Sequence, residues 1–216
     1  APAVAANDDS AIVFWRSAVS NAESTGDANA LLDFDARDCI MYSVYDNGSW
    51  GEPRMLYNGS NGAVKALQAA MLPDGTAVAV YTLDRSEAAP SEFDETKGES
   101  GYEIAYTIVG SDGELGTTML ATSDTWLDEN PQVVTANFGE GDDRFVIGWH
   151  SLQDGESNIQ MLAVDENGAM SNDFPASLTA LVRDGSAAIN GDFRLAAMNQ
   201  KDGIENLTIL WSETVE

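Results

Sequence analysis

AIVFWRS, at residues 11–17, is the stretch that decides the fold, because related stretches return three more times along the chain. The copies are AVAVYTLD at 77–84, FVIGWHS at 145–151 and LTILWSE at 207–213. Each copy is a short run of strand-forming residues that ends in an aromatic residue and a polar tail. The aromatic residues, Trp15, Tyr81, Trp149 and Trp211, lie 66, 68 and 62 residues apart. This regular period predicts an internal repeat, and the repeat determines the fold class.

Each copy belongs to a longer unit that predicts four strands. A first strand precedes each copy, at 2–7, 65–72, 131–138 and 193–199. The turns between them are rich in Asp and Gly, which favour hairpins. A third strand is indicated by alternating apolar and polar residues at 40–44, 104–108 and 159–163. A shorter fourth strand is expected at 54–57, 117–121 and 176–181.

Repetition of the whole four-strand unit predicts an all-β fold, a partial β-propeller of about three and a half four-stranded antiparallel blades. We expect one domain with blades at 1–60, 61–125 and 126–185 and a half blade at 186–216. Small residues recur near the end of each first strand, where strands crowd around a propeller axis. A β-sandwich is the alternative, but it does not explain why the unit repeats whole.

The turn after the third strand of the first unit, DNGSWGEP at 46–53, carries a family resemblance. With the strand that begins at Pro2, the Asp-Gly hairpins and the runs ending in Trp, it resembles the repeats of bacterial secreted and surface β-propellers. It is also similar to the Asp-box blades of sialidase-like propellers. Residues 46–50 are one residue short of that pattern, and the turns at 112–113 and 165–170 lack the Trp. The resemblance implies a propeller, and these departures place sialidase activity in doubt.

The charge of the chain restricts its partners. The sequence has 36 acidic and 10 basic residues, which give a net charge of −26 at pH 7. Such a surface repels nucleic acid and anionic membranes, so we expect neither as a partner. No apolar run has the length of a membrane-spanning helix, and membrane insertion is not expected. The acidity fits a solvated surface, or attraction of divalent cations or basic partners.

We expect no cofactor, with calcium as the one metal to consider. Asp33, Asp35 and Asp38 alternate in the connection after the first copy and could converge on a hard cation. They lack the Gly and the final Glu of a calcium loop, and Arg37 could neutralise them instead. Cys39 is the only cysteine, so an intrachain disulfide is excluded. Its place beside an apolar residue predicts a buried hydrophobic side chain.

The candidate ligand-binding residues are Arg16, Trp126 and His150. In a propeller, the connections between second and third strands gather at one face, and two of them, 18–38 and 85–101, are long. Arg16 and His150 end second strands, where they could bind an acidic or hydroxylated ligand. Trp126 lies in a connection at the same face, where it could stack on a carbohydrate or a peptide. Each has an alternative without a ligand. The long connections could be surface insertions, His150 could be an exposed side chain at a strand end, and Trp126 could pack on a neighbouring loop.

We expect a binding, adhesion or scaffolding module without catalysis, belonging to a larger extracellular or cell-surface protein of a bacterium. A glycan or a protein is the expected ligand, and no Gly-x-Ser-x-Gly elbow accompanies the single histidine. The alternative is a fragment of a carbohydrate-active propeller enzyme, sialidase-like or another glycoside hydrolase. A structural spacer without a ligand is a third hypothesis. The open blade edges predict self-association, and two chains would supply about seven blades.

Overall fold

The computed structural model describes residues 1–19, 37–59, 63–85, 101–139, 141–153, 156–171, 188–200 and 203–214. These residues form an all-β structure without helices, arranged in four antiparallel sheets. The first sheet contains β1 (Ala3–Ala6), β2 (Ala11–Val19), β3 (Arg37–Asp46), β4 (Ser49–Trp50) and β5 (Arg54–Tyr57). The second contains β6 (Ala63–Met71), β7 (Ala77–Asp84), β8 (Tyr102–Val109) and β9 (Leu115–Leu120). The third contains β10 (Leu127–Asn137), β11 (Asp143–Gln153) and β12 (Glu156–Val164), and the fourth contains β13 (Ala188–Gln200) and β14 (Gly203–Thr214).

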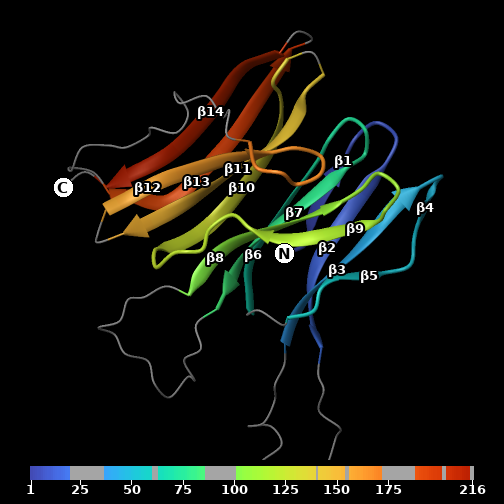
Figure 1. Cartoon of the computed structure of the whole chain (residues 1–216), viewed down its shortest axis with the longest axis horizontal. Coiled ribbons are helices and arrows are strands. Elements are labelled where there is room, and N and C mark those ends of the chain that lie inside the picture. The colour runs from blue at the N-terminus through green and yellow to red at the C-terminus, as the bar shows by residue number, and fades with distance from the viewer. Residues whose placement is uncertain are drawn as a thin grey trace, which may run out of the picture.

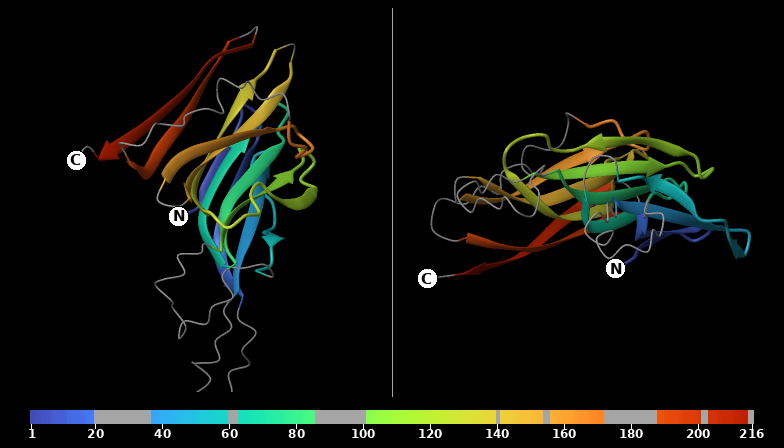
Figure 2. Two further views of the ribbon diagram at one scale, coloured as in Figure 1. Left: turned by 60° about the vertical axis from the view of Figure 1, so that its left-hand side comes forward. Right: turned by 90° about the horizontal axis from the view of Figure 1, so that it is seen from below.

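Within each sheet the strands follow one another as a meander, each paired with the next along the chain, except that β5 pairs with β3 on the same side as the short β4. The four sheets stand in chain order, with the first (blue to cyan) and the fourth (red) at opposite ends of the array (Figure 1). In both views of Figure 2 the fourth sheet (red) lies at the side of the array away from the cyan strands of the first sheet. The predicted all-β fold, a partial propeller of antiparallel blades, is therefore confirmed.

The strands match the predicted runs, with differences at their ends. The run at 77–84 coincides with β7. β11 ends at Gln153 and β12 begins at Glu156, so both strands reach into the connection expected at 152–156. After Asp46, the turn at Asn47 and Gly48 adds β4, which the sequence did not predict. Both turn residues have positive φ, 51° and 84°, as a type I′ reversal requires. The strand expected at 176–181 lies outside the described residues, and the blade limits stay a prediction.

The repeated aromatic residue packs on the sheet before its own. Tyr81 of the second sheet is fully buried in an apolar cluster with Phe14 of the first sheet. Trp149 of the third sheet is buried in a second cluster with Val80 of the second sheet. Side chains alternate along a strand, so the neighbours of each aromatic residue face the following sheet. The fold is thus a stack of sheets held by apolar faces on both sides.

The first strands of all four sheets meet along one groove. Its volume is about 470 Å³, and its lining is Val4, Ala5, Ala6, Ala69, Ala70, Met71, Val134, Thr135, Ala196 and Ala197. These residues belong to β1, β6, β10 and β13, which are the inner strands of their sheets. The prediction that small side chains mark the crowded axis is confirmed, because larger ones would hold the inner strands apart.

Candidate functional site

A cavity lined by ionisable and hydroxyl-bearing side chains lies between the first and second sheets. The turns β1–β2, β3–β4, β6–β7 and β8–β9 meet there. We call this the turn end, and the opposite end, where β2–β3 and β7–β8 connect, the long-loop end. The cavity, here the inter-blade cleft, has a volume of about 510 Å³. That is within the usual range for small-molecule sites.

The polar groups of the inter-blade cleft come from turns and from the strands beside them, and local hydrogen bonds hold several of these segments in place. Asp112 Oδ1 accepts the Glu114 N–H at 2.9 Å, which shapes the β8–β9 turn around Gly113. The hydroxyl of Ser43 donates to the Gly51 carbonyl at 2.7 Å and holds the chain after β4 against β3. The groups presented to the cleft are therefore preorganised by short-range hydrogen bonds.

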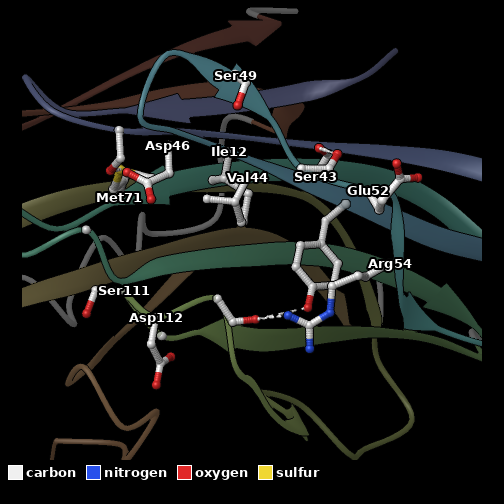
Figure 3. Close-up of a pocket in the computed structure, with 16 residues that line it drawn as sticks. Ile12, Ser43, Val44, Asp46, Ser49, Glu52, Arg54, Met71, Ser111 and Asp112 are labelled. Carbon is white, nitrogen blue, oxygen red and sulfur yellow. Dashed lines mark hydrogen bonds between the residues drawn. The ribbon is translucent and has the colours of Figure 1, made fainter.

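The cleft lining combines hydroxyl and carboxylate groups around one guanidinium. The carboxylates belong to Asp46, Glu52 and Asp112, and the serine hydroxyls to Ser10, Ser43, Ser49 and Ser111. Figure 3 shows Asp112 and Ser111 on one side of the cleft and Asp46, Ser49 and Glu52 on the other. The apolar floor includes Ile12 and Val44 of the first sheet.

Arg54 is the only basic residue of the cleft lining, and its guanidinium is already engaged. One amino group donates to the Gly113 carbonyl at 2.6 Å, as the dashed line in Figure 3 marks. The guanidinium lies 5.5 Å from the centre of the Tyr42 ring, and the Tyr42 hydroxyl donates to the same carbonyl at 3.2 Å. Burial raises the pKa of Tyr42, and the nearby Arg54 partly offsets this. Arg54 therefore ties the first sheet to the second.

A second polar cluster is buried at the long-loop end, between the second and third sheets. Thr122 Oγ1 donates to Glu103 Oε2 at 2.6 Å, and Trp149 Nε1 donates to Asp128 Oδ1 at 3.1 Å. Asp128 is 1% exposed, and its Oδ2 has no well-formed hydrogen bond. Burial raises the pKa of both Glu103 and Asp128. The negative charges of Asp128 and Asp124 raise the pKa of Glu103 further. Two acids with raised pKa values are a recognised sign of a functional site.

Of the three residues predicted to bind a ligand, two belong to the third sheet or its border, and Arg16 lies apart from them in the first sheet. Arg16 is on β2 of the first sheet, whereas His150 is on β11 of the third and Trp126 directly precedes β10. His150 is buried, so the exposed strand-end position considered for it is wrong; its Nδ1 lies 3.4 Å from Glu129 Oε1. Trp126 is partly buried, and its backbone N–H donates to Asp124 Oδ1 at 2.8 Å. A binding role for the three residues stays a prediction.

Of the predicted calcium ligands, only Asp38 lies within the described residues. Its Oδ2 accepts from the Arg16 guanidinium at 3.0 Å and from the Val64 N–H at 3.2 Å. This ion pair joins two residues that the sequence analysis had assigned to separate sites. Asp33 and Asp35 lie outside the described residues. In the described ranges no three His, Cys, Asp or Glu residues are placed to hold a metal ion.

Sequence reasoning did not find the inter-blade cleft or the acid cluster. Glu103 stands in a strand between Tyr102 and Ile104, and an acid at such an apolar position is a usable signal, whereas Asp128 is followed by Glu129 and Asn130 and gives no such signal. For Asp112 and Asp46 the turn motifs were noticed, but only as turns. Cys39 is buried, as predicted. Among the described residues there is no helix with the length and apolarity to cross a bilayer.

Comparison with solved structures gives a likeness of low identity. No family model matches the chain, and no curated protein matches it. A solved structure described as from the GH130 family of mannoside phosphorylases, which contains glycoside hydrolases that target beta-1,2 mannosidic linkages in Candida mannan, aligns with a TM-score of 0.39 and 12% identity. The alignment covers 89% of this chain and 56% of the other. The chain therefore spans little more than half the length of that structure.

This comparison corrects one expectation. The sequence led us to expect a chain without catalysis, whereas the structure found belongs to a family of carbohydrate-cleaving enzymes, so we no longer hold that expectation. A TM-score below 0.5 assigns no activity to this chain. Of the predicted resemblance, the propeller-like architecture holds, and no match supports a sialidase-like family.

Proposed function

We propose that the chain binds a neutral, hydroxyl-rich ligand of the carbohydrate class in the inter-blade cleft. The observation that carries the proposal is the lining itself, in which three carboxylates and four serine hydroxyls surround a cavity of about 510 Å³. Carboxylates accept strong hydrogen bonds from hydroxyl groups, and serine hydroxyls both donate and accept. A sugar presents hydroxyl groups in many directions, as such a lining requires.

The charge of the lining selects against anionic ligands. Asp46, Glu52 and Asp112 contribute three acidic groups, and the single guanidinium of Arg54 is held by the Gly113 carbonyl and lies 3.9 Å from Glu114. An incoming carboxylate would meet unbalanced negative charge, and the whole chain carries −26. The cleft therefore favours neutral sugars over acidic ones such as sialic acid.

A glycan array tests this proposal, followed by calorimetry with the best neutral oligosaccharide. Asp112→Asn keeps the oxygen that shapes the turn but removes the charge, and we expect binding to weaken about tenfold or more, as for loss of a charged hydrogen bond. Glu166→Gln is the matched control, because Glu166 is an exposed turn acid outside the cleft. Unchanged affinity in the Asp112 variant, or binding of acidic glycans only, would contradict the proposal.

A second candidate function is catalysis on carbohydrate, which one observation favours. Glu103 and Asp128 form a pair of buried acids with raised pKa values, and glycoside cleavage uses two carboxyl groups of which one stays protonated. The test is release of sugar from neutral oligosaccharides, with and without phosphate, by the wild type and by Glu103→Gln. Turnover that the substitution abolishes supports this candidate. Binding of the oligosaccharide without release of sugar would support binding and argue against catalysis.

The setting of the chain is also a proposal. We propose that it belongs to a larger extracellular or cell-surface protein of a bacterium, supported by its acidity and by a single, buried cysteine. Calcium remains a candidate for the segment that holds Asp33 and Asp35. Calorimetry with Ca²⁺ on the wild type and on Asp33→Asn tests this. Titrations of both proteins without binding heat would argue against a calcium site in this segment.

A further inference from the structure

We propose that the outer face of the first sheet is a docking surface for the fourth sheet of a second copy of this chain. The outer face is the side of the first sheet that points away from the second sheet. It is formed by Val4, Val13, Trp15, Met41, Tyr45, Trp50 and Met55. This surface is distinct from the inter-blade cleft and does not depend on the proposed ligand.

The strand register places these side chains on one face. Val4 pairs with Val13, Trp15 with Met41, Met41 with Met55, and Tyr45 with Trp50. Directly paired residues point to the same side of a sheet. The intervening residues Ile12, Phe14, Ile40 and Tyr42 are buried against the second sheet. The outer-face residues therefore point the other way.

The outer face is apolar and open in the described part of the chain. Val4 is 61% exposed and Trp50 51%, and Met55 is also exposed. The rings of Tyr45 and Trp50 lie against each other, with centroids 5.3 Å apart. Three of the seven exposed large hydrophobic side chains in the described residues thus lie on this face. Exposed apolar residues gathered on one surface mark an interaction site.

The repeat indicates what covers this face. Tyr81 and Trp149 occupy the same position of their units as Trp15, and each packs on the sheet before its own. Trp15 has no preceding sheet among the described residues. The outer face is therefore continuous with the series of inter-sheet contacts, and within the described residues no other sheet packs on it.

The fourth sheet presents that surface at the other end of the array (Figure 1). Phe193, Leu195, Leu207 and Ile209 pack toward the third sheet. The alternate residues, Arg194, Ala196, Thr208 and Leu210, are exposed, and Leu210 is 65% exposed. The register pairs Arg194 with Leu210 and Ala196 with Thr208, which places all four on the free face. Each internal contact joins such a face to the outer face of the following sheet.

A second copy can use both free faces at once. If the fourth sheet of one copy packs on the first sheet of the other, two-fold symmetry repeats the same contact and closes a ring. The propensity of open blades to self-associate, expected from the sequence, would then act through sheet faces in addition to edges. The charge of −26 on each copy opposes association, so screening by salt strengthens it.

Light scattering after size exclusion of the 216-residue chain measures the association. We expect a dimer whose population rises as the salt concentration rises. Val4→Asp places a charge on the outer face of the first sheet in every copy, and Leu210→Asp does the same on the free face of the fourth sheet. Because each contact needs one face of each kind, each variant alone is expected to be a monomer. An equimolar mixture of the two retains one good pair of faces and is expected to form a heterodimer. Circular dichroism of each variant confirms that it folds.

Leu115→Asp is the matched control, because Leu115 is 38% exposed on β9, away from both faces. It should remain a dimer. A wild type that stays monomeric at every salt concentration would overturn the proposal and indicate that another partner covers the face. A Leu210→Asp variant that still dimerises would also overturn it, because the contact would then join two first sheets.

Discussion

The hydroxyl of Tyr106 donates to the Gly168 carbonyl at 2.8 Å, across the contact between the second and third sheets. Tyr42 makes the equivalent bond to Gly113 across the first and second sheets, at 3.2 Å. Both glycines have positive φ, 78° at Gly113 and 83° at Gly168, so the turn that presents each carbonyl requires glycine. The apolar stacking of the blades is thus fixed in register by a repeated polar bond.

Tyr106→Phe should destabilise the protein by about 1–3 kcal/mol, because it leaves the buried Gly168 carbonyl without its donor. Burial raises the pKa of Tyr106 to about 12, so the hydroxyl remains a donor at ordinary pH. Urea denaturation measures the change in unfolding free energy. Tyr45→Phe is the control, since Tyr45 packs on the exposed Trp50, and its effect should be smaller. Equal effects would argue against the inter-blade bond.

Gly148→Ala should weaken the packing of the fourth sheet on the third. An added Cβ would lie 2.9 Å from Leu195 Cδ1, 3.2 Å from Met161 Cγ and 3.3 Å from Phe193 Cε2. Overpacking of this kind costs about 1–3 kcal/mol. Hydrogen exchange of the amides in β13 and β14 should accelerate selectively. Gly51→Ala is the control, because its nearest contact is a carbonyl at 3.4 Å, and exchange in the fourth sheet should not change.

The acid cluster makes stability depend on pH. Burial raises the folded-state pKa of Glu103 above its ordinary 4.5 and that of Asp128 above 3.8. The folded state then binds more protons than the unfolded state, so this stabilisation is complete below the ordinary values and is lost as pH rises through the folded-state values. Unfolding free energy should therefore fall from about pH 4 toward neutral.

Glu103→Gln isolates one member of this cluster. The amide oxygen can still accept from Thr122, and no charge forms when the pH rises, so the decline in unfolding free energy should be shallower than in the wild type. Chemical denaturation at a series of pH values measures both curves. Parallel curves would show that Glu103 titrates normally, and that general repulsion among the acidic residues accounts for the pH dependence.

Removing either partner of the ion pair between Arg16 and Asp38 should reduce stability by a different amount. Arg16 is partly exposed, so Arg16→Ala should cost less than about 1 kcal/mol. Asp38→Ala should cost more, because the Val64 N–H in the second sheet also loses its acceptor. Thermal denaturation of both variants measures the difference. Equal losses would indicate that the contact with the second sheet contributes little.

The stacking of blades could be predicted from the sequence because it depends on local, periodic signals. Tyr81 and Trp149 fall at one position of the repeat, and alternation along the strand then fixes which side they face. The small residues of the axis, such as Ala69 and Ala196, follow from the same period. These features need no knowledge of which distant residues meet.

The candidate site could not be predicted in this way, because it depends on contacts between units. Asp112 and Asp46 come from turns of different sheets, and their positions across one cleft follow from how the sheets stack. Likewise, the acid cluster depends on Glu103 of the second sheet lying near Asp128 of the third, whose charge raises the pKa of Glu103. The burial of His150 also follows from the stack, since the residue ends a predicted strand and its sequence neighbours give no sign of a cover.

The most direct test of the stacked-blade structure is a nuclear Overhauser measurement on methyl-labelled protein. The structure places the Trp149 ring in one cluster with Val78, Val80 and Ile104 of the second sheet. We therefore predict cross-peaks from the Trp149 ring protons to the methyl groups of these three residues. A Trp149 ring whose only methyl contacts lie within its own sheet would contradict the packing of each blade on the one before it.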